Sequence, residues 1–182
     1  MDKPLTPARI IIVMGVSASG KSTIGKNVAR RLHLPFLEGD EFHPEANIDK
    51  MRNGIALTDE DRWPWLEAMA KGLAKAADRK GAVGGACSAL RRAYRDFMVE
   101  KAGEPILFVY LDGSREVIGE RMATRQHEYM PLSLLDSQFA TLEVPDPETE
   151  NVLFVPVTDS IGRITTSVVN AVGHLRSFKR KQ

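Results

Sequence analysis

Residues 9–32 constrain the fold of this 182-residue chain more than any other stretch. Arg9–Met14 reads RIIIVM, a β-branched apolar run without alternation, which is typical of a strand covered on both faces. A glycine-rich loop follows, and residues 22–32 then repeat apolar side chains at four-residue spacing, which indicates one face of a helix. A strand, a glycine-rich loop and a helix in this order predict the first unit of a parallel α/β sheet.

The loop itself has the spacing G-x-x-x-x-G-K-S from Gly15 to Ser22. Glycines at both ends let successive backbone N–H groups point inward, and with the N-terminus of the following helix they form an anion site. We expect Lys21 to reach the β- and γ-phosphates of ATP or GTP, Ser22 to ligate Mg²⁺, and Thr23 to contact the α-phosphate. The predicted phosphate-binding residues are Gly15, Ser17, Ala18, Ser19, Gly20, Lys21, Ser22 and Thr23. Because alanine tolerates a positive φ poorly, we expect no left-handed conformation at Ala18.

Apolar runs and helical patterns alternate along the rest of the chain. Strands are predicted at 35–37, 82–87, 106–111 and 152–157, and helices at 63–73, 90–100, 114–126, 132–142 and 161–178. Thr58 and Asp61 have capping-box spacing, and Ser88 is a candidate cap for the helix that follows the 82–87 strand. This order predicts an α/β fold with a mostly parallel sheet, in a single domain over residues 1–182.

Composition narrows the class of partner. The formal net charge is +1, which gives no global electrostatic reason to bind nucleic acid or a membrane. Cys87 is the only cysteine, so no intramolecular disulfide can form, and we expect a small, buried, unreactive side chain there. With no signal-like or membrane-spanning apolar run in the sequence, we expect a cytoplasmic protein.

Kinases, GTPases and ATP-driven motors all share this type of loop. A GTPase usually has an Asn/Thr-Lys-x-Asp segment late in the chain, and this sequence has none. A motor usually has an acidic residue after a strong apolar strand. Asp112 follows ILFVYL, but Gly113 and Ser114 then begin a helix, so Asp112 is equally well read as a turn residue. A small kinase fits the length best.

Two carboxylates, Glu38 and Asp40, follow the second predicted strand. In an open parallel sheet the carboxyl ends of the strands face the ligand. Asp40 is therefore a candidate base for an acceptor hydroxyl, and Glu38 a candidate Mg²⁺ ligand through water. A solvated acidic loop explains the same spacing.

Four longer segments narrow the type of kinase that the sequence predicts. EGDEFHPEANIDKM begins at 38, GIALTDEDRWPWL at 54, CSALRRAYRD at 87 and SQFATLEVP at 137. In order and spacing they resemble the gluconate kinase family. The resemblance implies phosphorylation of D-gluconate by ATP to ADP and 6-phosphogluconate, and commonly a homodimer. It also implies the three-layer α/β/α fold of nucleoside-monophosphate kinases, shared with shikimate kinase, with a mobile lid.

By position, the resemblance implies that Asp40 is the base for the 6-hydroxyl and that Arg62 contacts the sugar acid. A sugar acid brings one carboxylate and many hydroxyls, so its site needs cations and polar groups. The predicted substrate-binding residues are Asp40, His43, Lys50, Arg62, Arg91 and Arg92, with Asn47 as a further polar group. The sequence leaves open which of Arg91 and Arg92 faces the substrate.

Arg121 and Arg125 lie one helical turn apart and precede a polar segment. With the resemblance they predict a lid at about 121–137 whose arginines close over the transferred phosphoryl group. A solvated helix face gives the same spacing. We also expect the loop at 156–162 to border the adenine.

Two other functions stay open at this point. One is a related kinase acting on another acidic acceptor, such as shikimate or a different aldonate. The other is a non-catalytic module that only senses ATP. Asp40, Arg62 and the two lid arginines argue against the sensor, since a sensor needs no acceptor base.

Overall fold

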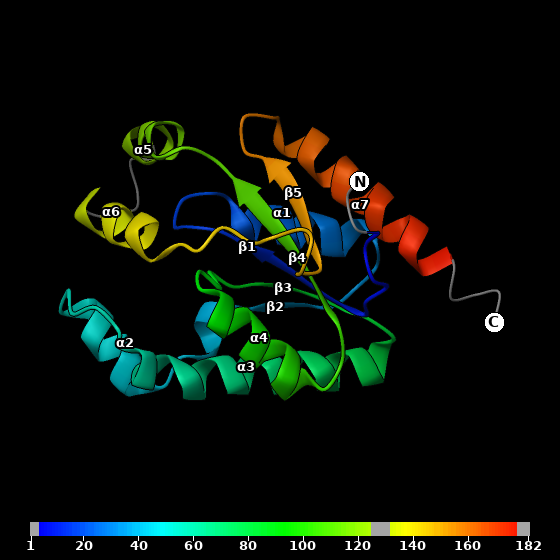
Figure 1. Ribbon diagram of the computed structural model, residues 1–182, viewed down its shortest axis with the longest axis horizontal. Coiled ribbons are helices and arrows are strands. Elements are labelled where there is room, and N and C mark those ends of the chain that lie inside the picture. Colours follow the sequence, from blue (N-terminus) through cyan, green and yellow to red (C-terminus); the bar gives the residue numbers. More distant parts are fainter. Residues whose placement is uncertain (1–3, 125–131, 178–182) are drawn as a thin grey trace.

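A parallel sheet lies at the centre of the computed structural model, which describes residues 4–124 and 132–177 (Figure 1). Its five strands in the described chain are β1 (Ile10–Met14), β2 (Phe36–Glu38), β3 (Val83–Ala86), β4 (Ile106–Asp112) and β5 (Val152–Pro156). The strand order is β2-β3-β1-β4-β5, and every neighbouring pair is parallel. The carboxyl ends of all five strands therefore lie at the same edge of the sheet, which is where the site is predicted.

Helices cover both faces of this sheet. The helices in the described ranges are α1 (Lys21–Arg31), η1 (Gly39–Phe42), α2 (Glu45–Arg52), α3 (Asp59–Lys80), α4 (Arg92–Ala102), α5 (Arg115–Thr124), α6 (Leu132–Thr141) and α7 (Ile161–Ser177). Figure 1 shows α3 and α4 below the sheet and α1 and α7 above it. The three-layer α/β/α arrangement of a P-loop kinase is confirmed.

The central strand β1 explains why its sequence does not alternate. Ile10, Ile12 and Met14 pack in the apolar cluster shared with α3 and α4, whereas Ile11 and Val13 pack in the cluster shared with α1 and α7. All five residues are buried. A strand with helices on both faces needs apolar residues at every position.

The start of α4 differs from the prediction. The helix begins at Arg92 rather than near Leu90, and Ser88 does not cap it. Ala89 has φ +44°, so the chain makes a tight turn after β3 before it becomes helical. The first N–H of α4, at Arg92, is instead taken by the carboxylate of Glu143 at 2.7 Å.

The start of α3 agrees with the prediction. The Thr58 hydroxyl accepts from the Asp61 N–H at 3.3 Å, and the Asp61 carboxylate accepts from the Thr58 N–H at 2.9 Å, which completes the capping box.

Within the described ranges, no helix is both long enough and apolar enough to cross a bilayer.

Candidate active site

The glycine-rich loop joins β1 to α1 at the carboxyl edge of the sheet. Gly15 has φ +148° and Gly20 has φ +100°, and Lys21 is the first residue of α1. The first N–H groups of a helix have no partner within the helix, so residues 21–23 present donors to this edge. Lys21 Nζ donates to the Val16 carbonyl at 2.9 Å. The geometry is that of an anion site.

Ala18 corrects a prediction. Its φ is +62°, a left-handed conformation that the sequence argued against. The loop imposes it, because the Val16 carbonyl accepts from both the Ser19 N–H and Lys21 Nζ and so pulls the chain into a tight turn around Ala18. Alanine tolerates this at a cost of about 1–2 kcal/mol.

Ser19 has a buried hydroxyl without a hydrogen-bond partner among the described residues. Its side chain is buried, and its hydroxyl makes no hydrogen bond within the part of the chain that the structure describes. Buried hydroxyls are nearly always paired in native proteins. An anion in the loop would supply the missing partner, so the residues present fit a phosphate.

Glu38, the last residue of β2, and Asp40, in η1, lie near the phosphate-loop lysine. Gly39 makes the turn possible, because a Cβ there would approach the Ala86 carbonyl oxygen to 2.4 Å. Asp40 is exposed in η1, and Glu38 is half-buried with Lys26 at 3.9 Å. Burial lowers the pKa of Lys21, and the negative charge of Asp40 opposes that shift. The structure therefore brings the predicted base within electrostatic reach of the phosphate-loop lysine.

His43 is held in one orientation at the start of α2. Its ring stacks on Trp65 with centroids 4.0 Å apart. The buried Asn47 amide lies 3.3 Å from His43 Nδ1 and donates to the Asp61 carbonyl at 2.9 Å. Burial lowers the pKa of His43. A neutral ring that accepts at Nδ1 has its proton on Nε2, where it can donate to a ligand.

Lys50 is already paired. Its ammonium bonds both oxygens of the Asp61 carboxylate, at 2.8 and 2.7 Å. The hydrogen bonds from Lys50 hold the pKa of Asp61 below its usual range. The same carboxylate closes the capping box of α3, so Lys50 ties α2 to the start of α3.

The guanidinium groups of Arg62 and Arg91 both lie near the ring of Tyr94. The guanidinium carbons of Arg62 and Arg91 lie 5.6 and 5.9 Å from the centre of the Tyr94 ring. Asp59 joins them, because its carboxylate accepts from the Tyr94 hydroxyl at 2.5 Å and from Arg91 at 3.2 Å, and lies 3.6 Å from Arg62. Burial, followed by this hydrogen bond, raises the pKa of Tyr94. Each guanidinium group has five N–H donors and these contacts use only some of them, so the pair suits a further carboxylate as ligand.

Sequence reasoning missed Asp59 and Tyr94 as members of this cluster. Tyr94 was visible only as an apolar position of α4, and Asp59 only as an acidic residue in the first turn of α3. The available signal was the spacing of Asp59 and Arg62, which places them on one helix face.

Arg92 points away from the cluster. It bonds the Thr149 hydroxyl at 3.0 Å and lies 3.6 Å from Asp96. Of the two adjacent arginines, the structure therefore brings only Arg91 beside Arg62. This placement favours Arg91 over Arg92 as a substrate contact, which stays a prediction.

The predicted lid residues are described only in part. Arg121, in α5, donates to the Val157 carbonyl, in the loop between β5 and α7. Arg125 and residues 126–131 lie outside the described residues. An ion pair between Arg115 and Asp136 joins α5 to α6.

Cys87 lies directly after β3 and is buried, as predicted. Burial raises the pKa of its thiol to about 12. We expect no reaction of the native protein with a disulfide reagent such as DTNB at pH 8, because the thiolate is the reactive form. Absorbance of the released thiolate should appear only after a denaturant is added. One equivalent released promptly from native protein would contradict this.

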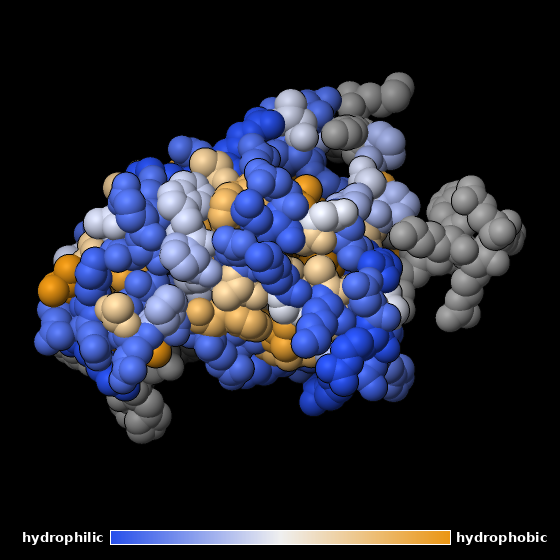
Figure 2. All heavy atoms as spheres, turned by 90° about the horizontal axis from the view of Figure 1, so that it is seen from below, coloured by the Kyte–Doolittle hydropathy of each residue, from blue (hydrophilic) through white to orange (hydrophobic). Residues whose placement is uncertain are grey.

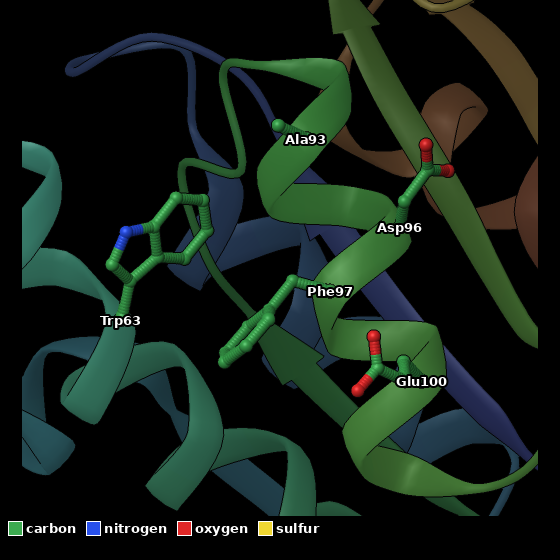
Figure 3. A pocket seen from close by; sticks show the side chains of 5 residues that line it. All are labelled: Trp63, Ala93, Asp96, Phe97 and Glu100. Carbon is green, nitrogen blue, oxygen red and sulfur yellow. The ribbon is translucent and has the colours of Figure 1, made fainter.

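A hollow between α3 and α4 is a separate feature. Its volume is about 530 Å³, and its lining side chains are Trp63, Ala93, Asp96, Phe97 and Glu100 (Figure 3). Figure 2 views the molecule from below and shows apolar atoms as limited patches on a mostly hydrophilic face. The lining carries two carboxylates and no cation. It therefore suits an anionic ligand poorly, and we read Trp63 as packing against Tyr94 and Phe97.

The chain is similar to several known proteins. A family model described as an AAA domain matches residues 10–145. The chain is 40% identical over 166 residues to the thermosensitive gluconokinase of Escherichia coli K12, covering 91% of this chain and 88% of that protein. It is 44% identical over 137 residues to a gluconokinase of Gluconobacter oxydans, covering 75% of this chain and 76% of that one. The crystal structure of a gluconokinase from Sinorhizobium meliloti is 42% identical with a TM-score of 0.82, covering 100% of this chain and 99% of that one.

Proposed function

This chain belongs to the gluconokinase family, and we propose that it transfers the γ-phosphoryl group of ATP to the 6-hydroxyl of D-gluconate. The observation that carries the proposal is the pairing of an anion-binding loop with two adjacent arginines, Arg62 and Arg91, at one edge of the sheet. The loop suits the donor's phosphates, and the arginines suit the acceptor's carboxylate.

The loop would hold the donor. The backbone N–H groups of residues 21–23, at the start of α1, would face the phosphates, Lys21 would bond the β- and γ-phosphates, and the Ser19 hydroxyl would gain its missing partner. Mg²⁺ would neutralise charge on those phosphates when bound with ATP. The oxygen donors Ser22 and Glu38 fit such a cation, with Glu38 acting through water.

Asp40 would act on the acceptor. As the gluconate 6-oxygen attacks the γ-phosphorus, its proton passes to the Asp40 carboxylate. A bond forms between that oxygen and phosphorus, the bond from phosphorus to the bridging β–γ oxygen breaks, and the electron pair leaves with ADP. Exposure of Asp40 at the strand edge supports this role, because an acceptor can reach it.

The sugar acid would lie between α2 and the arginine pair. Arg62 and Arg91 bind the carboxylate, and His43 Nε2 donates to a hydroxyl. The predicted substrate-binding residues also include Lys50 and Arg92. Lys50 is bound to Asp61, so we propose that it holds α2 against the start of α3, whereas the exposed Arg92 side chain bonds Thr149 away from the arginine pair.

A lid at about 121–137 would complete the site. Arg121 and Arg125 are proposed to neutralise charge on the transferred phosphoryl group. We propose that the adenine lies near residues 156–162, because this loop follows the last strand of the sheet. We further propose a homodimer and a cytoplasmic location. Light scattering of the purified protein would test the homodimer.

Replacing Arg91 by alanine should raise KM for gluconate by about tenfold or more, because a charge-assisted bond to the carboxylate is lost. Arg92→Ala is the matched control, and we expect a change of less than about twofold, since an exposed pair contributes little. Initial rates at varied gluconate and saturating ATP measure both. Equal effects, or the reverse order, would contradict the assignment.

The function itself is tested by the rate of ADP release with Mg-ATP and a panel of acceptors. The panel holds gluconate, its epimers, shikimate, glucose and no acceptor. Stimulation by gluconate well above every other acceptor is the expected result. Stimulation by shikimate or another acid alone would overturn the acceptor and keep the kinase. No stimulation with ATP still bound would favour a sensor.

A further inference from the structure

The SQFATLE stretch, residues 137–143, is one of the sequence segments that the roles above leave unexplained. It covers the end of α6 and the two residues that follow. Its two ends reach two different parts of the candidate site. We call residues 138–143 the α6 link.

Gln138, at one end of the link, binds the phosphate loop. Its side-chain oxygen accepts from the Ser17 N–H at 2.6 Å, and its side-chain nitrogen donates to the Ser17 hydroxyl at 2.8 Å. The half-buried Gln138 amide thus bonds both the backbone N–H and the hydroxyl of Ser17. A surface glutamine placed by chance would gain little from ordering so long a side chain.

Glu143, at the other end, binds the turn that carries the arginines. Its N–H donates to the Leu90 carbonyl at 2.8 Å, and its carboxylate accepts from the Arg92 N–H at 2.7 Å. These bonds enclose Arg91 on both sides along the chain. Between the two ends, Leu142 packs against both apolar clusters of the core, which anchors the link.

We propose that the α6 link positions the donor and acceptor parts of the site relative to each other, with Gln138 and Glu143 as positioning residues. The inference rests on the proposed function for the identity of the acceptor. Phosphoryl transfer depends chiefly on placement of the donor and acceptor, so a misplacement of about 1 Å is costly. Ser17 follows β1 and Arg91 follows β3, and the link joins these two loops directly, beyond the pairing of their strands.

The donor end is tested by ADP binding without any acceptor. Gln138→Ala removes both bonds to Ser17, and we expect the Kd for ADP to rise by about tenfold in calorimetric titration. The KM for gluconate should change by less than about twofold. Ser137→Ala, at the exposed neighbouring position on α6, is the control and should change neither value.

The acceptor end is tested by the opposite pattern. Glu143→Ala frees the Arg92 N–H and loosens the turn that holds Arg91, so KM for gluconate should rise by about tenfold while the Kd for ADP stays within about twofold. Glu148→Ala removes an exposed carboxylate from the following loop and serves as the control.

Each outcome decides the proposal. It is overturned if Gln138→Ala leaves ADP binding unchanged, or if either variant weakens both ligands equally in step with a fall in Tm. A wild-type protein that fails to phosphorylate gluconate overturns the proposed function and the acceptor half of this inference. The ADP titration tests the role of the Gln138–Ser17 bond whether or not gluconate is the acceptor.

Discussion

Replacing Asp40 by asparagine is expected to lower kcat by about 10²–10⁴-fold and to leave the Kd for ATP within about twofold. The amide keeps the size of the carboxylate but cannot accept the proton of the 6-hydroxyl. Asp40 influences Lys21 through its charge, so the substitution removes one charge near the phosphate loop and keeps the loop's own hydrogen bonds to Val16. ADP release at saturating substrates gives kcat, and titration with ATP gives the Kd.

Glu41→Gln is the matched control, because it removes an equally exposed carboxylate from the next position of η1. It should change kcat by less than about twofold. If Asp40→Asn weakened ATP binding as much as it slowed turnover, Asp40 would be a ligand for the nucleotide and not a base.

Replacing Arg95 by methionine should destabilise the protein by about 3–5 kcal/mol. Arg95 is 1% exposed and binds both oxygens of Glu150, at 2.5 and 3.0 Å. Its guanidinium also donates to the carbonyls of Ala89 and Leu90. Removing it leaves the Glu150 carboxylate and both carbonyls buried without these partners. For a chain of this length the Tm should fall by roughly 10 °C.

Arg92→Met serves as the control for stability. Arg92 lies on the surface of the same helix, 3.6 Å from Asp96, and we expect a change within about 0.5 kcal/mol. Thermal unfolding of both variants measures the difference. Equal losses would mean that the buried pair contributes no more than a surface pair.

The same pair should make stability depend on pH. Burial alone raises the pKa of Glu150, but hydrogen bonds from Arg95 and from the Asp146 N–H outweigh it, so the net pKa lies below its usual range. A lowered folded-state pKa stabilises the protein above the unfolded value of about 4.3. That contribution should be lost as the pH falls through the folded value, and Arg95→Met should flatten this part of the profile.

Much of the fold could be predicted, because its strongest signals are local. The β1 run, the glycine-rich loop and the first helix lie within 23 consecutive positions, Ile10–Met14 to Lys21–Leu32, and each has its own periodicity. The Thr58–Asp61 capping box needs only four residues. Such features depend on neighbours along the chain, so a single sequence contains them in full.

One failure is local, and the others concern contacts between residues far apart in the sequence. Ala18 takes φ +62° because loop hydrogen bonds to Val16 require it, against its own preference. Arg95 and Glu150 are 55 positions apart, and neither residue type predicts burial. The turn at Ala89 delays α4 beyond Ser88 for the same reason, because partners in other elements hold it.

Some features of the candidate site could be predicted from the sequence, and others could not. Residue types predicted which side chains suit phosphate and carboxylate, but not which of two adjacent arginines faces the site. Arg91 reaches Asp59 and Arg92 reaches Thr149, and only the folded chain separates them. Lys50 looked like a ligand for an anion, and its bond to Asp61 could not be foreseen from spacing.

Identifying the product by NMR tests the central claim most directly. The protein is incubated with Mg-ATP and gluconate, and the phosphorus spectrum is recorded with correlation to sugar protons. We predict one new phosphate ester coupled to the protons on carbon 6, in amounts equal to the ADP formed. An ester on another carbon, or ADP with free phosphate and no ester, would contradict the account.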